Sequence, residues 1–133
     1  MVILVVTIIG ILAAVAVPMY LDYAVRSQVA EGLNLAEGAK TAVTEYFQDR
    51  GSMPTGNTDA GLSAAAQIQG NYVTSVSVGN QDGVITVTFG NQANLVIVGQ
   101  AITLTADTTA PGSVQWICAS GAIADKYLPA ACR

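Results

Sequence analysis

The first 21 residues of the chain, Met1 to Leu21, contain no charged side chain. At ~1.5 Å per residue, a helix of this length spans about 31 Å, which matches the ~30 Å hydrocarbon thickness of a bilayer. A cleaved signal peptide would show a basic start and a change of character after a shorter apolar stretch. Here the start lacks basic residues and the helical pattern continues, so we expect a helix that can span a membrane once.

The apolar run continues into an amphipathic helix. Apolar residues recur at helical spacing over the next seven turns, near one face: Val25, Val29, Leu33, Ala36, Val43 and Phe47. Asp22 and Arg26 stand four residues apart with opposite charge, a spacing that supports a helix. Gly51 supplies a stop, with Pro54 shortly beyond. Residues 1 to about 49 are therefore predicted to form one rod of roughly 75 Å.

Gly10 and Pro18 interrupt the apolar half of this rod. Pro18 has no amide hydrogen to donate to the carbonyl of Ala14, so the helix can bend or loosen between Gly10 and Pro18. A simple kink in a membrane anchor is the alternative. Thr7 carries the one hydroxyl group between Met1 and Val17, and we expect it to bond back to its own helix.

The remainder of the chain predicts a β-rich head. Residues 52–70 have the composition of a surface loop. Alternating segments at 72–78 and 84–89 predict a hairpin, 101–106 and 113–118 predict two further strands, and 95–98 predicts either a short strand or a buried connector. One face of these strands is polar and the other apolar, so the second half of the helix must cover the apolar face. The predicted fold class is α+β, a long N-terminal helix packed on a four-stranded antiparallel sheet.

Composition limits the chemistry of this head. The chain has no histidine and a formal net charge of −4, which disfavours metal sites, catalytic triads and general attraction to nucleic acid. No phosphate loop, nucleophile elbow or metal-ligand spacing occurs, so neither an enzyme nor a cofactor is expected. Cys118 and Cys132 form an even pair in a small domain, which indicates a disulfide and a location outside the cytoplasm. Trp116 is expected in the core.

The segment "GILAAVAVPMYLDYAVRSQ", followed by an amphipathic helix, a β-rich head and a C-terminal cysteine pair, resembles a type IV pilin. The likeness is to the long-helix major pilins, the fimbrial subunits of Gram-negative bacteria, and it is dense from Ile8 to Gln28. It implies an N-terminally methylated subunit that waits in the inner membrane. The subunit then joins an extracellular filament by packing of its helices, and the helix loosens between Gly10 and Pro18 during assembly.

The sequence departs from the pattern of the family at its first residue. Members of the family usually begin with phenylalanine and carry an acidic residue 17 positions before the proline. Counting back from Pro18, that position holds Met1. The family pairs this carboxylate with a neighbour's N-terminal amine. Either the start of this sequence differs from the native one or the protein lacks the carboxylate, so we transfer that role to no residue here.

The resemblance also gives a domain organisation and candidate contacts. A projecting helix half (1–24) precedes a head (25–133) made of an amphipathic helix half (25–50), a loop (51–71), a sheet (72–118) and a disulfide-bounded loop (118–132). In pilins this last loop is exposed and contributes to subunit contacts and adhesion. Four residues are the candidates here, with ordinary solvated loop residues as the alternative: Asp125, Lys126, Tyr127 and Arg133.

Self-association is the first expectation among partners. Small residues let membrane helices approach closely, so helix packing is expected at Gly10, Ala13, Ala14 and Ala16. The resemblance further implies three kinds of partner: the pilus assembly machinery, host or abiotic surfaces, and phage. The roles that it implies are adhesion and twitching motility. Nucleic acid could bind only at a local patch near Lys126 and Arg133. Two alternatives remain: a pseudopilin or minor pilin, and a single-pass anchored binding module.

Overall fold

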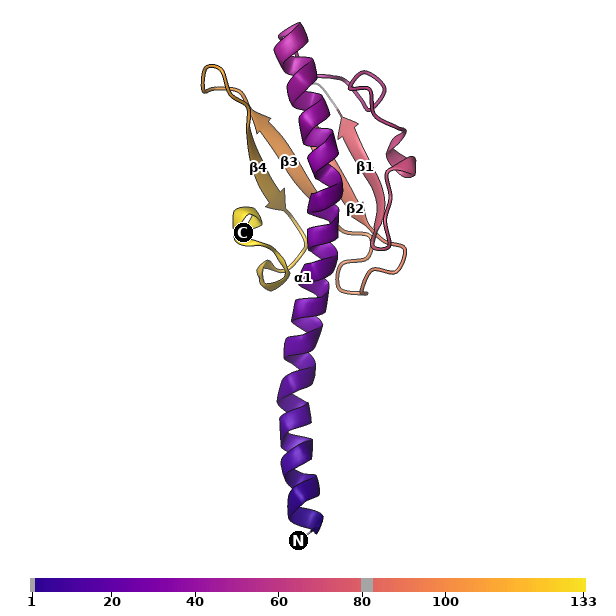
Figure 1. Ribbon diagram of the computed structural model, residues 1–133, viewed down its shortest axis with the longest axis vertical. Helices are drawn as coiled ribbons and strands as arrows, with labels where there is room; N and C mark the ends of the chain where they lie inside the picture. Colours follow the sequence, from indigo (N-terminus) through magenta and orange to yellow (C-terminus); the bar gives the residue numbers. More distant parts are fainter. Residues whose placement is uncertain (1, 80–82) are drawn as a thin grey trace.

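A long helix carries a small sheet on one end and projects from it at the other (Figure 1). The computed structural model describes residues 2–79 and 83–133 and, within the helix, the side chains of all but residues 16–19. The elements are α1 (Val2–Arg50), η1 (Ala65–Gln67), β1 (Val73–Gly79), β2 (Val84–Phe89), β3 (Ala101–Asp107), β4 (Gln115–Ser120), η2 (Asp125–Tyr127) and η3 (Ala130–Cys132). The predicted α+β class is confirmed.

Helix α1 is continuous over 49 residues, or about 74 Å at ~1.5 Å per residue. It ends where the sequence predicts. Gly51 adopts a positive φ of 71°, which glycine reaches without the steric penalty of a side chain. Its N–H donates to the carbonyl of Phe47 at 2.8 Å, so the glycine closes the last turn and turns the chain away from the helix axis.

The second half of α1 buries one stripe against the sheet. Val25, Val29, Ala36 and Val43 are completely buried, as their helical spacing predicts. Leu33, from the same predicted face, is partly buried at the edge of this stripe. Because the buried positions recur every three, four or seven residues, the opposite face of this half stays in solvent.

Gly32 sets the distance between α1 and the sheet. A Cβ at this position would lie 2.7 Å from two ring carbons of Phe89 and 3.0 Å from a methyl group of Val87. These contacts are closer than side-chain atoms tolerate, so glycine lets β2 pack directly against the helix backbone. Phe89 fills the space and is itself buried.

The sheet is antiparallel with strand order β1-β2-β3-β4. Its strands alternate buried and half-exposed residues in β1, β2 and β3, so one face is dry and the other wet. The segment at 95–98 forms a turn in which Ile97 is fully buried. Neither expectation for this segment is met in full, because it forms no strand and, of its four residues, Ile97 alone is buried.

Strand β4 lies two residues later than predicted. It begins at Gln115 rather than Ser113 and continues to Ser120. Its register with β3 pairs Asp107 with Gln115 and Ile102 with Ser120. The preceding turn contains Gly112 at a φ of 76°, and this turn uses the residues that the alternation had assigned to the strand. Trp116 is partly buried against the core rather than within it.

The loop between α1 and the sheet is held by one buried amide. Asn57 donates through Nδ2 to the carbonyls of Ser63 and Val76 at 2.9 and 3.0 Å. Its Oδ1 accepts the N–H of Val78 at 2.6 Å. Because every polar atom of this buried side chain is satisfied, the loop is fixed to the edge of β1.

Candidate assembly surface

The projecting half of α1 is covered with large apolar side chains. Those that stand exposed between residues 2 and 21 are Val2, Ile3, Leu4, Val5, Val6, Ile8, Ile9, Ile11, Leu12, Val15, Tyr20 and Leu21. Of the residues that the structure describes, α1 is the one helix long and apolar enough to cross a membrane. Within a single chain, nothing in the described residues removes this surface from water.

The small residues expected at helix contacts lie on this projecting half. Ala13 and Ala14 are exposed, and a Cβ on Gly10 would meet no atom within 4 Å. Ala16 and Pro18 belong to α1, and their side chains lie outside the described residues. The hydroxyl of Thr7 donates to the carbonyl of Ile3 at 2.8 Å, which confirms the predicted bond within the helix. The role of the small residues in assembly stays a prediction.

The C-terminal segment contacts α1 where the helix leaves the head. Lys126 Nζ lies 3.9 Å from Asp22 Oδ1, and Arg26 Nε donates to the main-chain carbonyl of Lys126. The helix that the spacing of Asp22 and Arg26 supports is confirmed, but the two side chains form no ion pair with each other, because each turns to Lys126 instead. Helical spacing alone could not reveal a partner about 100 residues away in the chain.

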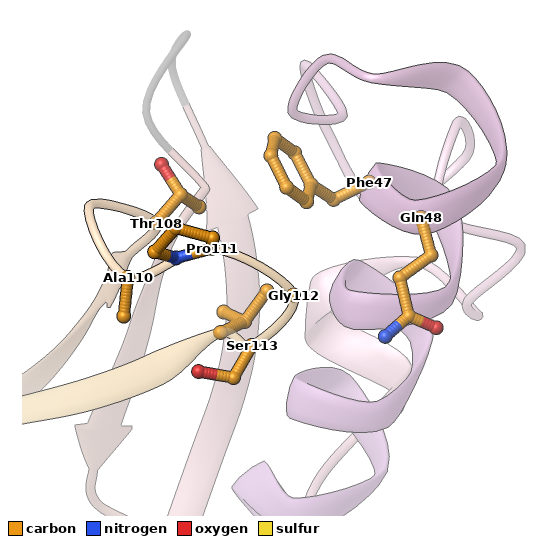
Figure 2. Close-up of a pocket in the computed structure, with 8 residues that line it drawn as sticks. Phe47, Gln48, Thr108, Ala110, Pro111, Gly112 and Ser113 are labelled. Atoms are coloured by element: carbon orange, nitrogen blue, oxygen red, sulfur yellow. The ribbon is translucent and has the colours of Figure 1, made fainter.

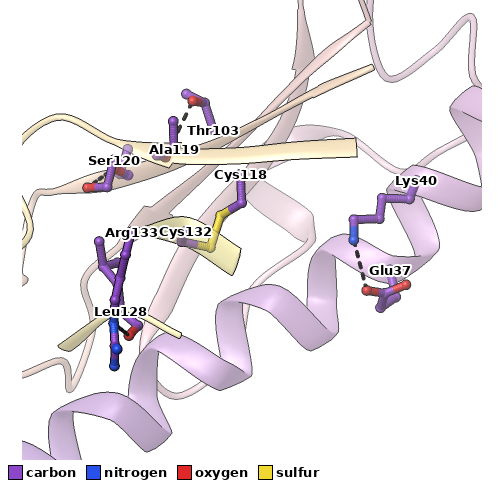
Figure 3. Close-up of a disulfide and its surroundings, with 10 residues drawn as sticks. Glu37, Lys40, Thr103, Cys118, Ala119, Ser120, Leu128, Cys132 and Arg133 are labelled. Carbon is purple, nitrogen blue, oxygen red and sulfur yellow. Dashed lines mark hydrogen bonds and ion pairs between the residues drawn. A yellow bond between two sulfur atoms is a disulfide. The ribbon is translucent and has the colours of Figure 1, made fainter. Parts of the chain in front are cut away.

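A disulfide holds this segment against the sheet. Cys118 and Cys132 are bonded with their Cα atoms 4.6 Å apart, as the sequence predicts. Figure 3 shows the bond joining β4 to η3. Next to it, Arg133 Nε donates to the carbonyl of Leu128 at 2.9 Å, and the side chain of Leu128 is fully buried. The disulfide-bounded loop is therefore partly a core element.

Tyr127 corrects the set of expected contact residues. Its side chain is only 7% exposed and belongs to the core, whereas Asp125, Lys126 and Arg133 are exposed. The short helix η2 turns the Tyr127 ring inward, and Lys126 Nζ covers it at 5.0 Å from the ring centroid. An aromatic ring between two charged residues and a leucine gives no sequence signal for its direction, which tertiary packing decides.

A shallow pocket lies at the opposite end of the head, with a volume of about 280 Å³. Figure 2 shows the Phe47 ring of α1 turned toward the loop between β3 and β4. Its lining is small or uncharged: Phe47, Gln48, Thr108, Ala110, Pro111, Gly112, Ser113 and Val114. Beside it, the hydroxyl and the N–H of Thr109 donate to Asp107 Oδ1 at 2.7 and 3.0 Å, and these bonds hold the pKa of Asp107 below its ordinary value. None of the residues that line the pocket is acidic or basic.

The geometry agrees with comparisons to known proteins. A family profile described as Pilin (bacterial filament) matches residues 25–133. The type IV major pilin protein PilE of Neisseria gonorrhoeae is 41% identical over 150 aligned positions, which cover 98% of this chain and 88% of that protein. Fimbrial protein EcpC of Eikenella corrodens is 48% identical, with 98% and 84% covered.

The match to a third relative covers less of that protein's length. A fimbrial protein of Neisseria meningitidis serogroup A is 47% identical over 116 residues, which cover 86% of this chain and 66% of that protein. The family profile covers the head, and the two longer matches extend along the projecting helix. The chain therefore belongs to the pilin family and is a structural subunit of a bacterial filament.

Proposed function

We propose that this pilin is the major subunit of a type IV pilus and that copies are held together by the projecting half of α1. The observation that supports the proposal is the change in what covers the side chains along one unbroken helix. Its second half is covered by the sheet of its own chain, and its first half is apolar and uncovered. Such a surface requires lipid before assembly and other copies after it.

Packing at small residues supplies the specificity of this assembly. Moving an apolar helix from lipid into a filament exchanges one apolar environment for another, so the gain must come from close approach of backbones. Gly10, Ala13, Ala14 and Ala16 are the positions that allow it. Pro18 leaves the carbonyl of Ala14 without its helical donor, so the stretch from Gly10 to Pro18 adjusts its path when neighbours pack on it.

The head and the projecting half have separate tasks in this proposal. Residues 1–24 form the membrane span and later the filament core, and residues 25–133 form the surface of the filament. Asp125 and Lys126 of the disulfide-bounded loop, and Arg133 directly after it, are the charged residues available for contacts between heads. Repetition of one head-to-tail contact by a rotation that does not close gives an open helical filament rather than a ring.

The roles of the filament follow from this location. The subunit resides in the inner membrane with the assembly machinery and then in an extracellular fibre that serves adhesion and twitching motility, with phage as a further candidate ligand. The role is structural rather than enzymatic. The net charge of −4 disfavours general binding of DNA along the fibre, and leaves the patch at Lys126 and Arg133 as the candidate for nucleic acid.

The test is a bulky substitution on the projecting half. Ala13→Leu should abolish filaments in material sheared from the cell surface, while the full chain stays in the membrane with a folded head. Ala66→Leu makes the same change at an exposed position of η1 and should leave filaments normal. Normal filaments from Ala13→Leu would refute helix packing as the basis of assembly.

Abundance distinguishes a major pilin from the alternatives. If the chain dominates sheared surface material by intact mass, it builds the fibre. A pseudopilin, a minor pilin or an anchored binding module would remain with the membrane fraction or form a trace of the sheared material.

A further inference from the structure

The loop between β2 and β3 carries an apolar surface that the head does not use. Leu95 at its tip is 88% exposed, and Val96 and Val98 are each more than 40% exposed. Of the described residues, the other large apolar side chains that stand exposed lie on α1 between residues 2 and 15 and at Tyr20, Leu21 and Tyr23, together with Ile117 on β4. The loop is thus a second exposed apolar surface besides the projecting helix.

This loop is held firmly in place. The carbonyl of Asn94 accepts the N–H groups of Ile97 and Val98 at 3.0 and 2.9 Å, and its Oδ1 accepts the N–H of Val96 at 3.0 Å. Ile97 is fully buried and anchors the turn in the core. Since the backbone is already ordered, little conformational entropy is lost when another surface packs against Leu95.

The loop adjoins the projecting half of α1. Gln28 Oε1 accepts the N–H of Asn94 at 2.8 Å, and Figure 1 shows the loop beside α1 at the end of the sheet where the helix leaves the head. Leu21 and Ala14 precede Gln28 by seven and fourteen residues, so all three lie near one face of the helix. Ala14, Leu21 and Gln28 thus define a stripe that begins on the projecting half. The loop contacts this stripe at its Gln28 end.

We propose that Leu95, Val96 and Val98 pack against the projecting half of α1 from a second copy of this chain. The second helix lies along the stripe at Ala14 and Leu21 and meets the loop where that stripe reaches the head. This inference rests on the proposed function. Residues 90–100 contain no charged side chain, and neither do residues 1–21, so this contact buries apolar surface without an unpaired charge.

The first test identifies the neighbour directly. A photoreactive benzophenone side chain at position 95 of the full-length pilin is activated in sheared filaments, and trypsin products are analysed by mass spectrometry. The earliest tryptic site follows Arg26, so the projecting half stays in one peptide. We expect an adduct between that peptide and the peptide carrying position 95, and we expect it in a band with the mass of two chains, because the loop also adjoins α1 of its own chain. The same probe at position 117 is the control and should give no such adduct.

The outcomes separate this inference from the proposed function. Adducts of position 95 with lipid alone, with head peptides alone, or with nothing, in filaments that form normally, would overturn the loop contact and leave the filament proposal intact. Absence of unmodified pilin from sheared material would instead refute the filament proposal.

A second test measures the contribution of the contact. Leu95→Gln should lower filament yield about tenfold, the change expected from losing most of one buried leucine. Ile117→Gln, at the matched exposed position on β4, should leave the yield unchanged. Since Leu95 is exposed in the single chain, the unfolding midpoint of the head should match that of the unmodified pilin. A normal yield from Leu95→Gln would overturn the proposal.

Discussion

The two halves of α1 share one backbone conformation and differ in what covers them. Residues 25–50 present one buried stripe to their own sheet, and residues 2–15, together with Tyr20 and Leu21, present apolar side chains in every direction. In lipid, a helix satisfies its backbone hydrogen bonds internally, except where a proline such as Pro18 removes a donor. In water, the second half depends on packing of its apolar face. Continuity of the helix therefore comes from the backbone, and its two environments come from the side-chain pattern.

A charge placed in each half should separate these environments. Val29→Asp puts a carboxylate at a completely buried position, which should lower the free energy of unfolding of the head by about 3–5 kcal/mol. The measurement is urea unfolding of the detergent-solubilised chain, followed by fluorescence of Trp116, the single tryptophan.

The matched control is the same substitution in the projecting half. Val5→Asp changes an exposed residue in the second turn of α1, far along the helix from the buried stripe, so the unfolding midpoint should not move, although insertion into the membrane should suffer. Equal destabilisation by the two variants would mean that the halves are not energetically separate.

Removing the disulfide should give the next largest effect. The bond closes a loop with a sequence separation of 14, and the double variant Cys118→Ser and Cys132→Ser should lower the free energy of unfolding by about 3 kcal/mol in the chain-entropy model. The effect belongs to the head alone, so membrane insertion of the projecting half should be normal. An unfolding midpoint equal to that of the unmodified chain would contradict this expectation.

Most of the fold follows from local patterns in the sequence. The charge-free run, the spacing of Val25 and Val29 and the stop at Gly51 predict α1, since a helix face and a helix end are encoded within a few residues. The boundaries of β4 could not be predicted in the same way. Its register is fixed by pairing with β3 and by the turn at Gly112, and these depend on the position of another strand.

The candidate surface was predictable to a different extent. The projecting half and the cysteine pair follow from composition and counting. The inward direction of Tyr127, the contact of Asp22 with Lys126 and the exposure of Leu95 all depend on where the C-terminal segment and the β2–β3 loop pack. The apolar run at 95–98 predicts a short strand or a buried connector, because an exposed turn and a buried segment can share the same apolar residues in sequence.

The smallest expected effect lies at the boundary between the two halves. Asp22 and Lys126 are 3.9 Å apart, with side chains 37% and 58% exposed, and such a pair is screened by water and salt. A double-mutant cycle of Asp22→Asn and Lys126→Gln should give a coupling below about 1 kcal/mol that shrinks as salt is added. Arg26→Ala is the control for the neighbouring contact. It should lower the free energy of unfolding by about 1 kcal/mol, whether or not Lys126 is replaced, since the acceptor of Arg26 is a main-chain carbonyl. A salt-independent coupling of several kcal/mol between Asp22 and Lys126 would show that the charged pair, rather than the buried stripe above it, fixes the point where α1 leaves the head.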